Sequence, residues 1–252
     1  MMTPLAAFGL TLVLVFAVLI LFFASRAAKA RVPILRPIAA FDNLKDIAAQ
    51  TKVSGGGTHL ALGVGRITDA STAETLAGVE VLSYLAENTA QTKTAPFVTT
   101  ADPAAAFLAQ HTVRNALHGD KTAIEETGAN VRWISPQPAA YAAGVMSTLS
   151  QEDLRHNVLI GKFGDEFLLM GEAGYRQHPP LKTVAGATDP NVLPYVMATS
   201  PQGLWGEEIF AAGAYLAEKP THIGSLLAQD AFRWGVGLTI LGGVIIKAFG
   251  VW

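Results

Sequence analysis

The segment THLALGVGRITDAST, residues 58–72, indicates the fold class of this chain. Its first half, THLALGVG, is a short apolar run that ends in glycines, a pattern typical of a buried strand. Ser71 follows, and Glu74 stands three residues later, which is the spacing of a capping box at the start of a helix. Apolar residues then keep helical spacing at Leu76, Val79, Leu82 and Leu85. The segment therefore predicts a strand, a tight turn and a helix.

The same alternation of strand and helix continues along the chain. PFVTT (96–100) and VRWIS (131–135) have strand-like composition, and helical patterns follow each of them at 104–117 and 139–149. Two further strands are predicted at TVAGAT (183–188) and YVMATS (195–200), before a helix over GEEIFAAGAYLAEK (206–219). Alternating strands and helices favour a mainly parallel sheet with flanking helices.

One segment departs from this alternation. The runs NVLIGKFG and DEFLLMGEAGY, residues 157–175, are joined too closely for a crossover helix, so we predict a β-hairpin there. The predicted fold is therefore α/β, with a mainly parallel but mixed sheet, flanking helices, one β-hairpin, and transmembrane helices at the N- and C-terminal ends.

Both ends of the chain are strongly apolar. Residues 5–24 contain no charge, and about 20 helical residues cross a hydrocarbon core of about 30 Å. A cleaved signal peptide is the alternative, but no basic residue precedes the run. Residues 234–252 are apolar apart from Lys247, and a buried C-terminal helix is the alternative there. The predicted division is a transmembrane helix at 1–25, a linker with an amphipathic segment at 26–57, an α/β domain at 58–225 and a transmembrane helix at 226–252.

Basic residues predict the orientation in the membrane. None precedes the first span, whereas four follow it closely, at Arg26, Lys29, Arg31 and Arg36. Because positive flanks stay on the cytoplasmic side, we expect a two-pass protein of the cell inner membrane, with a cytoplasmic domain and both termini outside. In the second span Gly235, Thr239 and Gly243 recur at every fourth position and would let another helix approach closely. Simple tolerance of glycine in membrane helices is the alternative explanation.

Composition excludes several functions. The net charge of −2 and a pI of about 6.3 exclude a strongly basic surface, so no nucleic-acid partner is expected. Without cysteine the chain has no disulfide, thiolate metal site or cysteine nucleophile. The six histidines have no metal-binding spacing, and no serine lies in a G-x-S-x-G context. We therefore expect no catalytic residue, no cofactor and no metal ion.

The turns between strands and helices offer one candidate ligand site. Helix N-termini and polar turns should gather at the carboxyl edge of the sheet, where α/β domains bind ligands. The candidate residues are Gly63, Gly65, Ser71, Asp102, Gln137, Asp189 and Ser200. The alternative is ordinary helix capping, and the glycine motif is incomplete, since Thr68 stands where the dinucleotide fingerprint has its third glycine. No lysine of the P-loop kind follows the turn, and Arg66 is the only evident cation nearby.

Three stretches carry a resemblance to a known family. They are STAETLAGVEVLSYLAE (71–87), PAAYAAGVMSTLSQEDLRHNVLIGKFGDEFLLMGE (138–172) and GEEIFAAGAYLAEKPTHIGSLLAQDAFRW (206–234). The amino-acid sequences of these stretches resemble an uncharacterised bacterial family of membrane-anchored domains of unknown function. The resemblance implies a membrane-anchored bacterial domain and brings no activity or catalytic residue with it.

Two functions remain open. In the first, the chain is a non-catalytic structural or scaffolding subunit of a membrane assembly, in contact with the lipid bilayer and with copies of itself or other membrane subunits. In the second, the carboxyl-edge crevice binds a nucleotide or another anionic metabolite, and the protein is a membrane-tethered sensor or enzyme.

Overall fold

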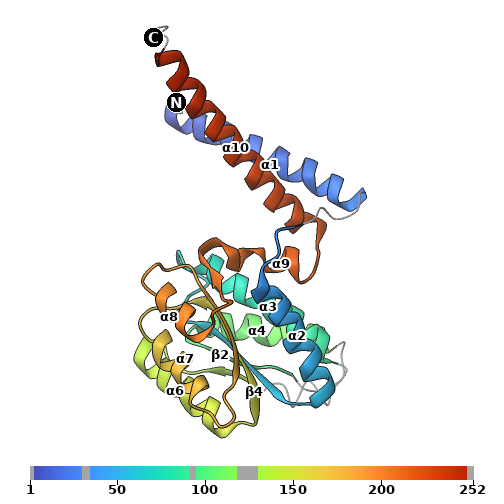
Figure 1. The fold of residues 1–252 in the computed structure, drawn as a ribbon, viewed down its shortest axis with the longest axis vertical. Helices are drawn as coiled ribbons and strands as arrows, with labels where there is room; N and C mark the ends of the chain where they lie inside the picture. The colour runs from blue at the N-terminus through green and yellow to red at the C-terminus, as the bar shows by residue number, and fades with distance from the viewer. Residues whose placement is uncertain (1–2, 30–34, 91–94, 118–129, 249–252) are drawn as a thin grey trace. The chain divides into compact units, whose positions relative to one another are not determined.

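The computed structural model describes residues 3–29, 35–90, 95–117 and 130–248 (Figure 1). Residues 30–34 of the predicted linker, which include Arg31, and residues 249–252 of the second predicted span lie outside this description. The chain divides into two compact units. One unit combines residues 1–36 with residues 213–252, and the other is formed by residues 37–212.

The unit of residues 37–212 is built on a six-stranded parallel sheet. Its strands are β1 (Gly57–Gly63), β2 (Phe97–Thr100), β3 (Val131–Trp133), β4 (Leu154–Lys162), β5 (Lys182–Ala187) and β6 (Leu204–Trp205). Their order across the sheet is β3-β2-β1-β4-β5-β6, and every neighbouring pair is parallel. All seven residues of β1 are buried, because this strand lies between β2 and β4 with both faces covered.

Helices cover both faces of this sheet (Figure 1). They are α2 (Ala39–Ser54), α3 (Thr72–Thr89), α4 (Pro103–Ala116), α6 (Pro138–Gln151), α7 (Phe167–Tyr175) and α8 (Leu193–Thr199). On one face α3 contacts both α2 and α4, and α6, α7 and α8 form the other layer. In that second layer Tyr141, Phe167 and Val196 pack in one buried cluster with Leu159 and Ala185 of the sheet. The predicted α/β class with flanking helices is therefore confirmed.

The predicted β-hairpin at 157–175 is wrong. Its first half is β4, but its second half is the helix α7, and the sheet contains no antiparallel pair among the described strands. Phe167 and Met170 are fully buried, whereas Leu168 and Leu169 are exposed. This burial follows the turn of a helix, and the apolar LLM run concealed the pattern in the sequence. The sheet is parallel throughout, not mixed.

Two neighbouring predictions are also corrected. The expected strand at 195–200 is instead part of the helix α8, which begins at Leu193 with Pro194 in its first turn. The expected helix at 206–219 is instead a 3-10 segment, η2 (Gly206–Ala211), followed by the short α9 (Ala212–Tyr215).

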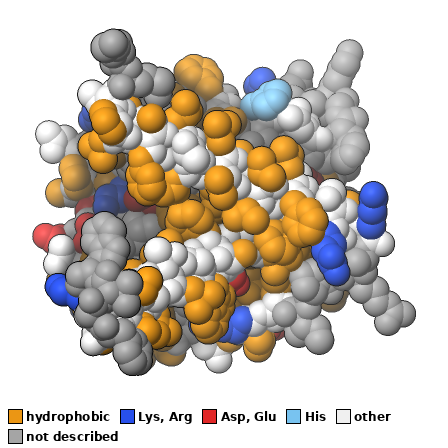
Figure 2. Space-filling view, turned by 90° about the horizontal axis from the view of Figure 1, so that it is seen from above, with side chains coloured by type: hydrophobic (Ala, Val, Ile, Leu, Met, Phe, Trp, Pro, Cys, Tyr) orange, Lys and Arg blue, Asp and Glu red, His pale blue; other side chains and the backbone are white. Residues whose placement is uncertain are grey.

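The second unit contains two long apolar helices, α1 (Pro4–Lys29) and α10 (Pro220–Ala248). Both are long and apolar enough to cross a membrane by length and composition, and none of the most apolar stretch of either is buried. Hydrophobic side chains accordingly cover a broad area of the surface in Figure 2. A small buried cluster of Ala27, Ala214 and Ile223 joins the two helices, and the Tyr215 hydroxyl donates a hydrogen bond to the Arg36 carbonyl at 2.7 Å.

Helices α1 and α10 run antiparallel where they touch. Gly224 lies so close to Ala24 that an added Cβ would come within 2.6 Å of the Ala24 Cα. Two turns further along α10, the rings of Phe16 and Phe232 meet edge to face at 5.9 Å between centroids. Both of these contacts lie in the first half of α10.

Candidate functional site

The strand order places a reversal point between β1 and β4. Chain connections run outward in opposite directions from these two central strands, and α/β sheets bind ligands outside the carboxyl ends of the strands at such a point. The elements that meet there are the turn after β1, the end of β4 at Lys162 and the turn after β5 at Asp189. Predicted residues Gly63, Gly65 and Ser71 belong to the first of these turns.

The two glycines of this turn are required by close packing. Gly63 has a φ of +81°, and a Cβ there would overlap the carbonyl oxygen of Lys162. At Gly65 a Cβ would come within 2.6 Å of the Thr75 hydroxyl oxygen and 2.9 Å of the Lys162 Cβ. The Val64 N–H also donates to the Lys162 carbonyl at 2.8 Å. Both glycines thus allow the turn to lie against the end of β4.

Side chains of the protein itself occupy donors of this turn. The Arg66 N–H donates to the Ser71 hydroxyl oxygen at 2.9 Å, and the Ile67 N–H donates to Asp102 Oδ2 at 3.2 Å. Ser71 is also held by Asp69, whose Oδ1 accepts from the Ser71 N–H at 2.8 Å. Hydrogen bonds from the Ser71 hydroxyl and N–H lower the pKa of Asp69. A phosphate that approached these two N–H groups would meet acceptors already in place.

The predicted capping box at Ser71 is not formed. Ser71 occupies the N-cap position of α3, but its side chain makes no capping hydrogen bond because it bonds to Asp69 and Arg66 instead. Glu74 is turned toward the loop after β5, where its Oε1 accepts from the Thr188 hydroxyl at 3.1 Å. Its Oε2 is buried without a hydrogen-bond partner among the described residues. An acceptor in that state destabilises the fold unless a water or ligand donor reaches it.

Of the other predicted site residues, some follow the carboxyl end of a strand and one does not. Asp102 caps α4, accepting from Ala105 N–H at 3.1 Å in addition to Ile67 N–H. Gln137 begins α6 without a side-chain cap, and its N–H donates to the Ser135 hydroxyl at 3.2 Å. Both follow the carboxyl ends of strands, as predicted. Ser200 does not, because it is the buried C-cap of α8 and precedes β6. The prediction that Ser200 lies on a strand-to-helix turn is therefore wrong.

Lys162 is a charged side chain at this edge that the sequence prediction missed. It is the last residue of β4, its stem packs on Gly65, and its Nζ lies 3.3 Å from Asp189 Oδ2. The pKa of Asp189 is lowered by the Asn191 N–H and by Lys162. Contacts through Lys162 and Ile67 thus connect Gly65, Asp189 and Asp102 along one edge. A lysine directly after the apolar run NVLIG was the available signal.

A chain of buried polar groups lies beneath the turn. The Gly63 N–H donates to the Tyr141 hydroxyl at 3.2 Å, and that hydroxyl is 3.2 Å from the Thr99 hydroxyl. Thr99 Oγ1 lies 2.9 Å from His59 Nε2, and His59 Nδ1 lies 2.7 Å from Asn157 Oδ1. Burial lowers the pKa of His59 to about 4 and raises that of Tyr141. Because His59 is neutral and Asn157 Oδ1 only accepts, the proton of His59 is on Nδ1, and Thr99 donates to Nε2.

The described residues do not assemble a metal-binding cluster of three or more histidine, aspartate or glutamate side chains. Among the described residues, the carboxyl edge offers the Lys162–Asp189 ion pair, the buried Glu74 Oε2 and a turn whose donors are partly occupied.

Comparisons with known proteins identify the family. No curated protein and no solved structure matches the chain. One family model matches residues 5–252, which is nearly the whole sequence. The resemblance to an uncharacterised family is thereby confirmed, and the chain belongs to the family described as a domain of unknown function, DUF6754.

Proposed function

We propose that this protein is a non-catalytic structural or scaffolding subunit of a membrane assembly. The observation that carries the proposal is the occupied turn at the reversal point. Asp102 and Ser71 accept the Ile67 and Arg66 N–H groups that a bound phosphate would use. The turn then serves to join β1, α3 and α4 through hydrogen bonds within the chain. We assign no catalytic residue to it.

In this proposal α1 and α10 anchor the protein in the cell inner membrane. Their length, their apolar composition and the exposure of their most apolar stretches support two spans. Arg26, Lys29 and Arg36 follow the first span, so the α/β domain faces the cytoplasm and both termini lie outside.

Lateral assembly would use the small-residue face of α10. Gly224, Ala228 and Phe232 share a helix face with Gly235, Thr239 and Gly243, because these residues recur at intervals of three or four. Helix α1 covers this face at Gly224, whereas nothing lies within 4 Å of a Cβ built on Gly235 or Gly243. The part of this face around Gly235 and Gly243 is uncovered, so a helix of a second copy or of another membrane subunit could approach it closely.

The mass of the full chain in mild detergent tests this proposal. Gly243→Ile should reduce the mass of the assembly, because the new side chain blocks close helix approach. Gly237→Ile is the matched control, since it makes the same change on the opposite side of α10, where nothing lies within 4 Å of a built Cβ. An unchanged mass for Gly243→Ile would exclude this face as a contact, and a monomeric wild-type chain would exclude the scaffold formed by self-association.

The second candidate function is binding of an anionic metabolite at the carboxyl edge. It is favoured by Lys162 at the reversal point and by the unpaired Oε2 of Glu74, which could accept from a ligand hydroxyl. A thermal shift with common nucleotides tests it. Stabilisation of the wild-type chain but not of Lys162→Met would favour a sensor or enzyme over a scaffold.

A further inference from the structure

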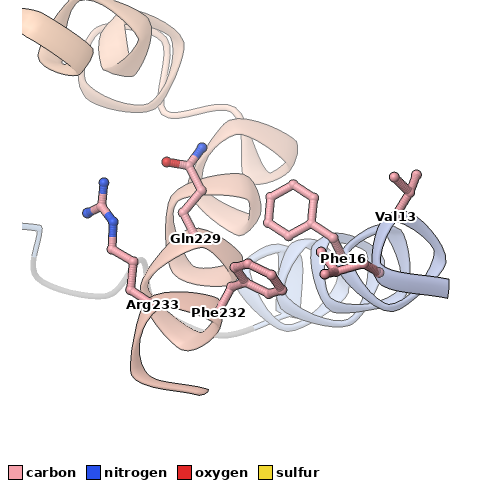
Figure 3. A pocket seen from close by; sticks show the side chains of 6 residues that line it. Val13, Phe16, Gln229, Phe232 and Arg233 are labelled. Atoms are coloured by element: carbon pink, nitrogen blue, oxygen red, sulfur yellow. The ribbon is translucent and has the colours of Figure 1, made fainter. Parts of the chain in front are cut away.

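Two of the pockets in the structure differ in the chemistry of their walls. The first lies between α1 and α10, where Val13, Phe16 and Phe232 line it together with Gln229 and Arg233 (Figure 3). It belongs to the helix pair that the proposed function places in the membrane. The second lies within the α/β domain, between the end of α2 and the start of β4, and most of its lining residues are polar. Its volume of about 460 Å³ is in the range of small-molecule sites.

This second pocket, the α2–β4 pocket, opens at the amino edge of the sheet. Helix α2 ends at Ser54, directly before β1, and β4 begins beside β1 at Leu154. The carboxyl edge, with Gly63 and Lys162, is at the other end of the same strands, so this pocket is separate from the turn at the reversal point. The residues that line it are Ala49, Gln50, Val53, Ser54, Arg155 and His156.

A one-residue bulge at the start of β4 brings Arg155 to this pocket. Gly57 pairs with Leu154 and Thr58 pairs with His156, so Arg155 is an extra residue in the pairing of β4 with β1. In a regular strand, successive side chains point to opposite faces of the sheet. The bulge re-aims the side chain, and Arg155 and His156 therefore line the same pocket.

Gly56 makes room for the Arg155 side chain. A Cβ built on Gly56 would lie 2.6 Å from Arg155 Cδ and 3.0 Å from its Nε, so the side chain lies across the backbone just before β1. No carboxylate in the described part of the chain forms an ion pair with the Arg155 guanidinium. A cation is thus held at the pocket without an ion-pair partner from the described residues.

His156 fixes the direction of the Gln50 side chain. Burial and the nearby cations Lys182 and Arg155 lower the pKa of His156 to about 4, so its ring is neutral at pH 7. The Nε2 of His156 lies 3.2 Å from Gln50 Oε1, which only accepts, so Nε2 carries the proton. Its Nδ1 lies 3.4 Å from each of two threonine hydroxyls, which can donate. The Gln50 amide NH₂ is therefore directed away from His156, and no described residue accepts from it.

The groups that remain for a ligand are donors beside an apolar wall. The donors are the Arg155 guanidinium and the Gln50 amide. The Ser54 hydroxyl gives no donor, because it donates to the Gln50 carbonyl at 2.8 Å. Ala49 and Val53 form the apolar wall, and Val53 is 89% exposed. A matching ligand has an anionic group that only accepts hydrogen bonds and a short apolar chain.

We infer that the α2–β4 pocket binds a small aliphatic carboxylate, with its oxygens on Arg155 and Gln50 and its chain against Ala49 and Val53. The planar guanidinium fits the two oxygens of a carboxylate in a forked pair of hydrogen bonds. This binding site goes beyond the scaffold role and is independent of membrane anchoring, because the pocket lies wholly within residues 37–212.

Ligand-detected NMR titration of the full chain in lipid nanodiscs tests the site with butyrate. Butyramide is the matched neutral ligand, since it has the same chain and no charge. Butyrate should bind saturably, and butyramide should not bind. Acetate should bind roughly fivefold more weakly than butyrate, because it lacks the methylene groups that pack against Val53. Empty nanodiscs give the background for each ligand.

Three variants test the role of Arg155. Arg155→Met keeps an unbranched stem and removes the guanidinium, so the affinity for butyrate should fall about tenfold or more. Arg114→Met is the matched control, because it makes the same change of charge on α4, outside the lining of the pocket, and should leave the affinity unchanged. Gly56→Ala retains every donor but displaces the Arg155 stem, so it should also weaken binding. Circular dichroism verifies that each variant is folded.

The outcomes separate this inference from the proposed function. Weaker binding in Arg155→Met and Gly56→Ala, with wild-type affinity in Arg114→Met, supports the site. Absence of saturable butyrate binding overturns it, as does equal affinity of the wild type and Arg155→Met. Butyramide or inorganic phosphate that binds as tightly as butyrate overturns the assignment to a carboxylate. The scaffold proposal is judged by the mass of the assembly, so either can fail alone.

Discussion

The backbone N–H of Gly63 donates a hydrogen bond at 3.2 Å to the hydroxyl of Tyr141, a side chain contributed by α6. This contact ties the turn at the sheet reversal to the opposite helical layer. It also ends the buried polar chain that runs through Thr99 and His59 to Asn157. The turn and the core beneath it are therefore coupled.

Removing the Tyr141 hydroxyl should destabilise the domain. Tyr141→Phe leaves the buried Gly63 N–H without its acceptor, which we expect to lower the free energy of unfolding by about 1–3 kcal/mol. Tyr175→Phe is the control, because Tyr175 is largely exposed and should change stability by less than about 0.5 kcal/mol. Urea unfolding in mild detergent measures both. Equal effects of the two substitutions would show that the Tyr141 contact contributes nothing.

The stability of the domain should fall in acid because of His59. Its pKa is about 4 in the folded chain and about 6.5 when unfolded. Below pH 6.5 the unfolded state binds a proton that the folded state does not, so stability is present above pH 6.5 and is lost as pH falls toward 4. The loss for this one group is on the order of 3 kcal/mol.

Urea unfolding at several pH values between 7 and 4 measures this effect. His156, whose pKa burial also lowers to about 4, contributes in the same direction. His59→Gln should therefore make the free energy of unfolding depend less steeply on pH without abolishing that dependence. A slope that His59→Gln does not alter would contradict the assignment of a neutral, buried His59.

Two glycines with positive φ should respond differently to a methyl group. Gly206 has a φ of +60° with nothing within 4 Å of a built Cβ, so Gly206→Ala should cost about 1–2 kcal/mol from backbone strain alone. Gly63→Ala adds a collision with the Lys162 carbonyl to similar strain, so we expect a loss of more than about 3 kcal/mol. Thermal unfolding compares the pair. A smaller loss for Gly63→Ala than for Gly206→Ala would show that the turn can move away from β4.

Pairing of α1 with α10 should depend on Gly224. Gly224→Val would place methyl groups against the Ala24 backbone and separate the helices, whereas Gly237→Val adds them in open space. The chain has no cysteine, so Phe16→Cys with Phe232→Cys introduces the only two thiols. A short bismaleimide should join them within one chain unless Gly224→Val is present. Efficient joining in that variant would contradict the packing at Gly224.

The orientation of the domain is tested with its lysines. Lys162 and Lys182 are partly exposed, and in the proposed orientation an impermeant amine reagent should label them only after cells are opened. Labelling in intact cells would place the domain outside.

Sequence patterns predicted the alternating architecture because β1, β2 and β3 are short apolar runs between turns and helices. They failed at α7, where Leu168 and Leu169 are exposed apolar residues that hide the helical period. They also failed at Lys162, because the proximity of this residue to Gly65 depends on the pairing of β4 with β1. No local pattern specifies which distant strand will be the neighbour, so the ion pair with Asp189 could not be foreseen.

The contact of Gly224 with Ala24 closes a loop in the chain. Residues 37–212 connect α1 to α10 along the chain. Because these two helices are paired, the ends of the connecting segment stay close together even when the domain unfolds. A tethered loop has fewer unfolded conformations than a free chain, and the helix pair therefore stabilises the domain in the manner of a cross-link. It also means that the two fragments left by a single proteolytic cut within the domain stay joined through the contact of α1 with α10.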